Sequence, residues 1–180
     1  NSTAARRRCC MNIIETDRLV LRRMTAADAP VVLALLNDPL FLRFIGDRGV
    51  RTPADAAAYI ERGPLASYTQ HGFGLYLVSL RTDDAAIGMC GLIKREGLDD
   101  VDLGFAYLPQ YGGRGYATEA AAAILHYGRT VLGLKRIVAI TAPDNAASIN
   151  VLQKVGLRHT RTIRLPSFQT DSLLFTPAEE

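Results

Sequence analysis

The sequence is poor in cysteine and lacks long apolar runs. Its 180 residues include three cysteines, two of them adjacent at Cys9 and Cys10, and nothing resembles a disulfide framework or the paired CxxC ligands of a zinc site. No stretch approaches the roughly 18 apolar residues that a membrane-spanning helix needs. We therefore expect a cytoplasmic protein that does not bind a membrane, with Cys90 as a small buried hydrophobe.

Histidine is also sparse. His71, His126 and His159 are scattered along the chain, without a metal-like spacing such as His-x-x-x-His. We expect no bound metal and no catalytic histidine.

A surplus of charge exists only at the N-terminus. Lysine and arginine number 21 against 18 acidic residues, and Arg6, Arg7 and Arg8 account for the whole surplus. The balanced remainder carries no electrostatic footprint for nucleic acid. Because Met11 opens what looks like a natural beginning, we interpret residues 1–10 as a disordered extension or a cloning remnant, and residues 11–180 as a single domain.

Helices are predicted among strands throughout the chain. Capping-box spacing at Thr25 and Thr52 predicts two early helices, and Gly156 fits a left-handed helix end. The expected strands are 19–24, 74–80, 86–94, 99–108, 136–141, 157–164 and 168–176, and the expected helices are 25–36, 52–68, 117–132 and 145–155, with a loop at 37–51. This order predicts an α/β fold with a mixed, mostly antiparallel twisted sheet flanked by helices.

A glycine-rich loop is the sharpest local feature. Residues 109–120 place Gly112, Gly113 and Gly115 between a predicted strand and the start of a predicted helix. Glycines allow close backbone approach, and a helix N-terminus offers unpaired N–H groups, so the loop could hold a pyrophosphate or simply make a tight turn. A P-loop would need Lys after its last glycine, and a dinucleotide fingerprint would need a glycine where Thr118 stands, so neither is favoured.

The surroundings of this loop resemble the GNAT family of acetyl-CoA-dependent N-acetyltransferases, and most closely its ribosomal-protein N-terminal alanine and serine acetylases. The resemblance runs from Ile14 to Leu174. It is carried by residues 15–22 (Glu-Thr-Asp-Arg-Leu-Val-Leu-Arg), 115–120 (Gly-Tyr-Ala-Thr-Glu-Ala) and 145–157. It implies that the domain at 11–180 is an N-acetyltransferase with acetyl-CoA as co-substrate.

The family's phosphate signature, Gln/Arg-x-x-Gly-x-Gly/Ala, fits two registers here. It can begin at Gln110, or it can run from Gly112 to Ala117 with Gly115 as its central glycine. We prefer the second register because it puts the backbone amides at the start of the helix. In that register Gly112 replaces the family's Gln or Arg. The resemblance implies that the cofactor is held by the loop, by a strand backbone and by one helix cap. The residues concerned are Gly113, Arg114, Gly115, Tyr116, Ala117 and Thr118, then Phe105, Ala106 and Tyr107, and Asn145. Arg114 could equally be a solvated loop charge.

Two residues are candidates for the chemistry. Asp102 stands in a strand where many family members carry Glu, and it is either the base, acting through water, or a solvated strand acid beside Asp99 and Asp100. Other branches of the family carry a Tyr hydroxyl where Leu152 stands, and Ser148 lies one helical turn before Leu152 on the same face. Ser148 is therefore either the proton donor to the leaving thiolate or a helix-cap residue. A strand N–H near Phe105 or Ala106 would stabilise the oxyanion.

The leading hypothesis is acetyl transfer to a protein N-terminal α-amine or a small-molecule amine, by direct attack in a ternary complex. The alternative is a CoA-binding regulatory or scaffold module without turnover; a nucleotide-binding regulator is disfavoured. Residues 37–51 and the second helix would shape the acceptor site, where Arg43, Arg48 and Arg51 suggest a carboxylate or phosphate or are simply solvated. The protein could form a homodimer.

Overall fold

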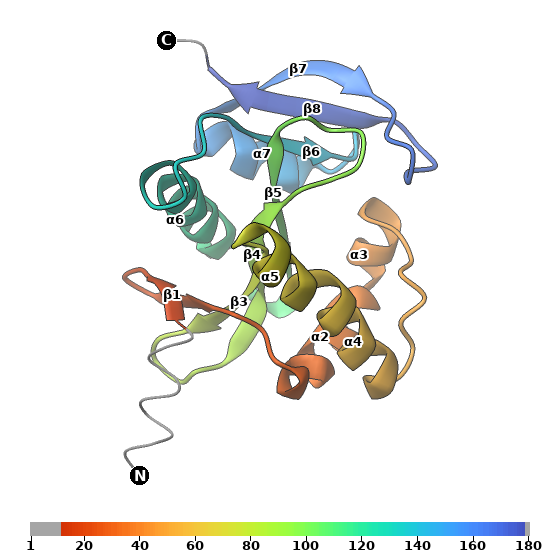
Figure 1. The fold of residues 1–180 in the computed structure, drawn as a ribbon, viewed down its shortest axis with the longest axis vertical. Helices are drawn as coiled ribbons and strands as arrows, with labels where there is room; N and C mark the ends of the chain where they lie inside the picture. The colour runs from red at the N-terminus through yellow and green to blue at the C-terminus, as the bar shows by residue number, and fades with distance from the viewer. Residues whose placement is uncertain (1–11, 179–180) are drawn as a thin grey trace.

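One eight-stranded sheet organises the fold (Figure 1). The computed structural model describes residues 12–178, so the extension expected at residues 1–10 lies outside the described part. The strands are β1 Asn12–Glu15, β2 Leu19–Arg22, β3 Leu75–Leu80, β4 Ala86–Ile93, β5 Val101–Tyr107, β6 Ile137–Thr141, β7 Leu157–Ile163 and β8 Ser172–Pro177. Their order is β1-β2-β3-β4-β5-β6-β8-β7, and only β5 and β6 run parallel. The predicted mixed, mostly antiparallel sheet is confirmed.

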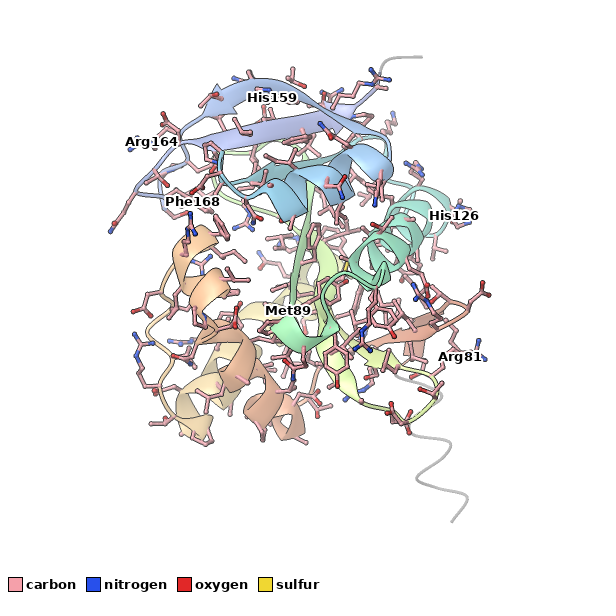
Figure 2. The ribbon with its side chains drawn as sticks, turned by 180° about the vertical axis from the view of Figure 1, so that it is seen from behind. Arg81, Met89, His126, His159, Arg164 and Phe168 are labelled. Carbon is pink, nitrogen blue, oxygen red and sulfur yellow. The ribbon has the colours of Figure 1, made fainter. Side chains whose placement is uncertain are left out.

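Helices cover both faces of this sheet (Figure 1). They are α2 Ala29–Leu36, α3 Pro39–Phe44, α4 Pro53–Ile60, α5 Ala66–His71, α6 Tyr116–Thr130 and α7 Ala146–Lys154, with short turns η1 Ala26–Asp28, η2 Glu61–Leu65 and η3 Pro109–Tyr111. Ile124 and Leu125 of α6 pack on Leu92 and Leu103 of the sheet. On the opposite face, α2 and α4 pack against β3 and β4, where Met89 lies (Figure 2). The alternation of side chains along each strand supplies both cores.

Local capping sets the helix starts. Thr52 and Asp55 form the expected capping box, in which Thr52 Oγ1 accepts from the Asp55 N–H at 3.1 Å and the Asp55 carboxylate accepts from the Thr52 N–H. The second helix runs further than predicted, to His71, through a π turn that accommodates Pro64.

Three expectations about elements are corrected. The loop expected at 37–51 contains α3, because Asp38 caps it by accepting from the Leu40 N–H at 3.0 Å and Pro39 occupies its first position. Strand β1 was not predicted. The last strand begins at Ser172 rather than at residue 168. Phe168 belongs to a turn instead, in which its N–H donates to the Leu165 carbonyl.

Residues 12–178 contain no helix with the length and apolar character needed to cross a membrane. Across the same residues, no three His, Cys, Asp or Glu side chains gather into a metal-sized group. Figure 2 places His126 on α6 and His159 on β7, well apart from each other.

Candidate functional site

The central feature of the site is a gap between β5 and β6. Strand β5 pairs with β4 as far as Tyr107, but its parallel pairing with β6 ends at Leu103 and Ala139. On its other edge β6 pairs with β8 from Ala139 to Thr141, while the part of β5 beyond Leu103 has no strand partner on the β6 side among residues 12–178. The family resemblance implies that the strands predicted at 99–108 and 136–141 separate, and the short pairing of β5 with β6 confirms this separation.

The peptide groups at this open edge can be assigned. The Leu108 N–H donates to the Ile87 carbonyl at 2.9 Å, which continues the β4–β5 ladder. Peptide groups point alternately to the two sides of a strand. The N–H groups of Phe105 and Tyr107 therefore point toward the gap, whereas that of Ala106 points toward β4.

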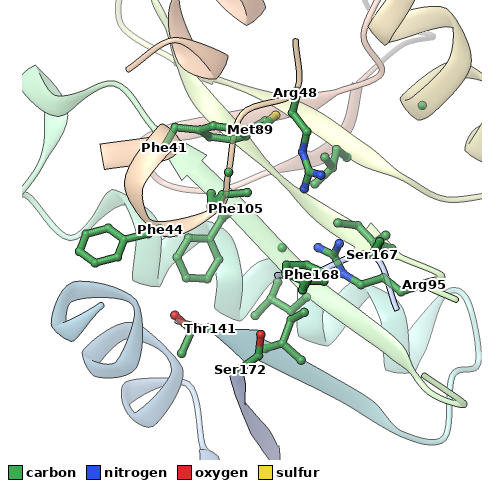
Figure 3. Close-up of a pocket in the computed structure, with 18 of the residues that line it drawn as sticks. Phe41, Phe44, Arg48, Met89, Arg95, Phe105, Thr141, Ser167, Phe168 and Ser172 are labelled. Carbon is green, nitrogen blue, oxygen red and sulfur yellow. The ribbon is translucent and has the colours of Figure 1, made fainter. Parts of the chain in front are cut away.

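A cavity of about 850 Å³ opens beside this edge (Figure 3). Its wall is formed by β4 with the residues after it, the middle of β5, α3 with the loop after it, the end of β6, the first turns of α7 and the loop between β7 and β8. The segment from the end of α4 through η2 and α5 to the start of β3 completes the wall. It brings together three of the predicted site residues, Phe105, Asn145 and Ser148.

The start of α7 is held by its own cap. Asn145 Oδ1 accepts from the Ser148 N–H at 3.2 Å, so the predicted capping role of Asn145 is confirmed. Ser148 and Leu152, one turn apart on α7, both line the cavity. Ser148 therefore borders the same cavity as Phe105 on the open edge of β5.

The glycine loop lies past the end of β5 and does not line the cavity. Gly113 (φ 72°) and Gly115 (φ 80°) have left-handed backbones, and α6 begins directly after Gly115. Among residues 12–178, a Cβ on Gly113 would meet no atom within 4 Å, and no side chain caps the helix. The N-terminal N–H groups of a fifteen-residue helix thus stay available to an anion, in the register that places Gly112–Ala117 at the helix start.

Arg18 ties this loop to the edge of the sheet. Its Nε donates to Glu119 Oε1 at 2.7 Å, its Nη1 donates to the Arg114 carbonyl at 2.9 Å, and its guanidinium lies 4.5 Å from the Tyr116 ring centroid. Burial alone would raise the pKa of Glu119, but hydrogen bonds from Thr16 and Arg18 outweigh it and leave that pKa below its usual value. Sequence reasoning missed this role, although Thr16 and Arg18 belong to the opening segment that carried the family resemblance.

The remaining loop and strand residues occupy the two faces of β5 and the first turn of α6. Tyr107 and Tyr116 pack against the core under α6, and Ala106 packs on the α2–α4 side. Thr118, with Ala117, lies in the first turn of α6, and the Arg114 side chain is exposed.

Asp102 is fully buried, which corrects the alternative of a solvated strand acid. Arg95 Nε donates to its Oδ2 at 3.0 Å, while its Oδ1 has no hydrogen-bond partner among residues 12–178. Burial raises the pKa of this carboxyl above its usual value, and the charge of Arg95 only partly opposes that shift. Asp102 does not itself line the cavity, whereas Arg95 does.

Several cavity residues were not singled out from the sequence as functional. Arg95 follows β4, and Phe168 lies in the β7–β8 loop with its ring centroid 5.5 Å from the Arg95 guanidinium. No local signal marks either residue, because their meeting depends on the order of strands in the sheet.

Known proteins share both sequence and fold with this chain. A family model described as an acetyltransferase (GNAT) domain matches residues 18–158. The chain is 33% identical over 145 residues to the uncharacterized N-acetyltransferase YnaD of Bacillus subtilis (strain 168), covering 81% of this chain and 82% of that protein.

Solved structures share the fold over nearly the whole chain. A GNAT-family acetyltransferase from Bacillus anthracis is 26% identical with a TM-score of 0.74, covering 91% of this chain and 96% of that one. RimL, a ribosomal L7/L12 α-N-protein acetyltransferase solved in complex with coenzyme A, is 16% identical with a TM-score of 0.77, covering 92% and 96%. At that identity the likeness to RimL shows the fold alone.

Proposed function

The chain belongs to the acetyltransferase (GNAT) family and is an acetyl-CoA-dependent N-acetyltransferase, and on that premise we propose that it acetylates a primary amine by direct attack in a ternary complex. The acceptor is a protein N-terminal α-amine or a small-molecule amine. One observation carries the proposal: the open edge of β5 at Phe105 and the Ser148 hydroxyl border the same cavity.

Acetyl-CoA fits the shape and chemistry of this region. The amides from Gly113 to Thr118 would receive its pyrophosphate at the start of α6, with Arg114 close enough along the loop to add a positive charge. The peptide groups of Phe105 and Tyr107 would pair with the pantetheine arm at the open edge of β5, with Ala106 between them. Asn145, at the start of α7, would border the acyl end.

The transfer forms a C–N bond and breaks a C–S bond. The neutral amine attacks the thioester carbonyl carbon, and the Phe105 N–H is placed to donate to the oxygen that gains negative charge. As the C–S bond breaks, the Ser148 hydroxyl protonates the departing thiolate sulfur, and solvent water carries the proton taken by Asp102 back to Ser148. Asp102 accepts the amine proton through water, since its carboxylate lies behind the cavity wall, and its raised pKa makes it a stronger base than a solvated carboxylate.

Calorimetric titration with acetyl-CoA, CoA and ATP is the first test. We expect micromolar binding of acetyl-CoA and CoA and none of ATP, followed by release of free CoA thiol when an acceptor amine is added. Absence of acetyl-CoA binding would mean that Gly112, in place of the family's Gln or Arg, disables the loop. Binding without thiol release on any amine would favour a CoA-binding module without turnover.

A Ser148→Ala substitution tests the proton donor. We expect kcat to fall roughly a hundredfold while the KM for acetyl-CoA stays within about twofold, because the hydroxyl acts on the leaving sulfur rather than on cofactor binding. Ser167→Ala, at a second serine that lines the same cavity, is the matched control and should leave kcat unchanged. Equal effects of the two substitutions would argue against the assignment.

A further inference from the structure

The cavity wall carries a surplus of positive charge that the rest of the described chain does not share. Its cationic residues are Arg43, Arg48, Arg62, Lys94 and Arg95, and its acidic residues are Asp47 and Asp171. Both acids are engaged by arginines outside the cavity lining, Asp47 by Arg51 and Asp171 by Arg164. The field inside the cavity is therefore positive, although the chain beyond residue 10 has balanced charge.

Arg48 is the cation of this group whose charge is least satisfied. Arg43 pairs with Asp144 at 3.3 Å, and the Lys94 Nζ donates to two backbone carbonyls, of Leu98 and Asp99. Arg48, on the loop between α3 and α4, makes no hydrogen bond or ion pair with any residue in the range 12–178. Figure 3 shows its guanidinium directed into the cavity, on the side where the guanidinium of Arg95 also lies.

Arg95 complements Arg48. Its Nε is committed to Asp102, while no ion pair or hydrogen bond with residues 12–178 occupies its two Nη groups. Two guanidinium groups that face one cavity repel each other unless an anion lies between them. A carboxylate or a phosphate accepts the forked hydrogen bonds that guanidinium groups offer.

An apolar wall adjoins these arginines. Phe41, Phe44, Phe105 and Phe168 line the same cavity, together with Met89 (Figure 3). The Phe105 edge is also where we place the thioester, so an acceptor bound by the arginines would extend along aromatic surface toward the reacting carbon.

We propose that the acceptor is an amine that also carries an anionic group, a carboxylate or a phosphate, bound by Arg48 and Arg95, with an apolar part against the phenylalanines. This inference rests on the proposed acetyl transfer and names its substrate class. The positive field would have a second effect: like charge disfavours the ammonium form, so it would favour the neutral amine that attacks. The same field would reject polyamines and other acceptors of high positive charge.

Matched pairs of acceptors test the inference. The release of CoA thiol is measured with a series of amino carboxylates of increasing length and with phenylalanine, each beside its amide, and with phosphoethanolamine beside ethanolamine. We expect kcat/KM to favour the anionic member of a pair by at least about tenfold. Comparing this preference between the amino carboxylates and phosphoethanolamine identifies whether the site binds a carboxylate or a phosphate.

Two variants give the control. Arg48→Gln should abolish the preference for the anionic member, while acetyl-CoA binding, followed by calorimetry, stays unchanged. Arg158→Gln, an exposed arginine on β7, should change neither.

The outcomes separate the two proposals. Acetylation of neutral amines as fast as their anionic partners, or a preference unchanged in Arg48→Gln, would overturn the anionic acceptor and leave acetyl transfer standing. If acetyl-CoA binds but no amine is acetylated, the proposed function fails, and titration of the anionic amines onto the CoA-bound protein decides this inference. Binding that is lost in Arg48→Gln would support it, and absence of binding would overturn it.

Discussion

At the scale of single residues, position along a strand decides which face a side chain occupies, but not how deep it lies. Asp102 alternates with Val101 and Leu103 as its strand requires. Its complete burial and its pairing with Arg95 arise because β5 is central in the sheet, with β4 and β6 on either side. Burial raises the free energy of the ionised carboxylate, and for the same reason it makes that carboxylate a better proton acceptor.

Asp102→Asn tests the proposed base. Because the pKa of Asp102 is raised, wild-type activity should fall as the pH drops through that raised value, where the carboxylate becomes protonated. The Asn variant should lack this acid limb and lose roughly a hundredfold in kcat at neutral pH, but less at high pH, where the ammonium form of the acceptor loses its proton to solvent. The measurement is kcat/KM against pH for both proteins.

The control for this experiment is Asp100→Asn. Asp100 lies in the turn before β5, and its partly exposed carboxylate pairs with Arg136. The substitution should leave the pH profile unchanged. A loss in Asp102→Asn that is equal at every pH would assign Asp102 a structural role.

Gly115 provides a second test at residue scale. Gly115→Glu places a negative side chain at the amides that would hold the pyrophosphate, and we expect CoA binding to become undetectable by calorimetry. The left-handed backbone adds a strain of about 1–2 kcal/mol. Gly133→Glu carries the same strain at the other end of α6, where φ is 67° and a Cβ meets nothing within 4 Å. CoA binding retained in Gly115→Glu, or lost equally in both, would contradict the assignment.

At the scale of elements, the start of α6 is held in place by a residue far away in sequence. Arg18 connects the turn between β1 and β2 to Glu119 and to the carbonyl of Arg114. These charge-assisted bonds hold the loop, so we assign Arg18 the role of a positioning residue.

Arg18→Ala should weaken CoA binding about tenfold, because the loop gains freedom that binding must then remove. Glu119→Gln should weaken it less, since the Arg18 bond to the Arg114 carbonyl remains. Arg129→Ala, at the exposed far end of α6, should have no effect. Calorimetry on the three variants measures this, and unchanged affinity in Arg18→Ala would remove the positioning role.

Most elements could be predicted from the sequence, since their determinants are local. The capping boxes at Thr25 and Thr52 and the cap at Asn145 act within three residues, and the structure confirms all three. Helix α3 was not predicted, although Asp38 and Pro39 carry a start signal, because the same two residues also fit the end of the preceding helix. Strand β1 has only four residues and finds its place through pairing with β2.

At the scale of the whole molecule, the sheet consists of two parts joined at the β5–β6 contact. Only three residue pairs connect them, from Val101–Ile137 to Leu103–Ala139. A ligand lying along the open edge of β5 and against α7 would contact both parts at once.

Acetyl-CoA should therefore stabilise the whole molecule against heat. At about 100 times its Kd it adds about 2.7 kcal/mol to the free energy of unfolding, which for a protein of this size raises the Tm by about 5–10 °C. Thermal unfolding followed by circular dichroism measures the shift, with ATP as the control ligand expected to give none. A Tm unchanged by saturating acetyl-CoA would contradict binding at this place.

The sequence by itself determined the kinds and order of most elements, the glycine loop at the start of α6 and the family. These follow from capping, from hydrophobic alternation and from backbone freedom, which operate over a few neighbouring residues. The tertiary structure decided the burial of Asp102, the hold of Arg18 on the loop, and the meeting of Arg48, Arg95 and Phe168 in one cavity. Those residues are far apart in sequence, and only the strand order, with β8 between β6 and β7 and the gap beside β5, brings them together.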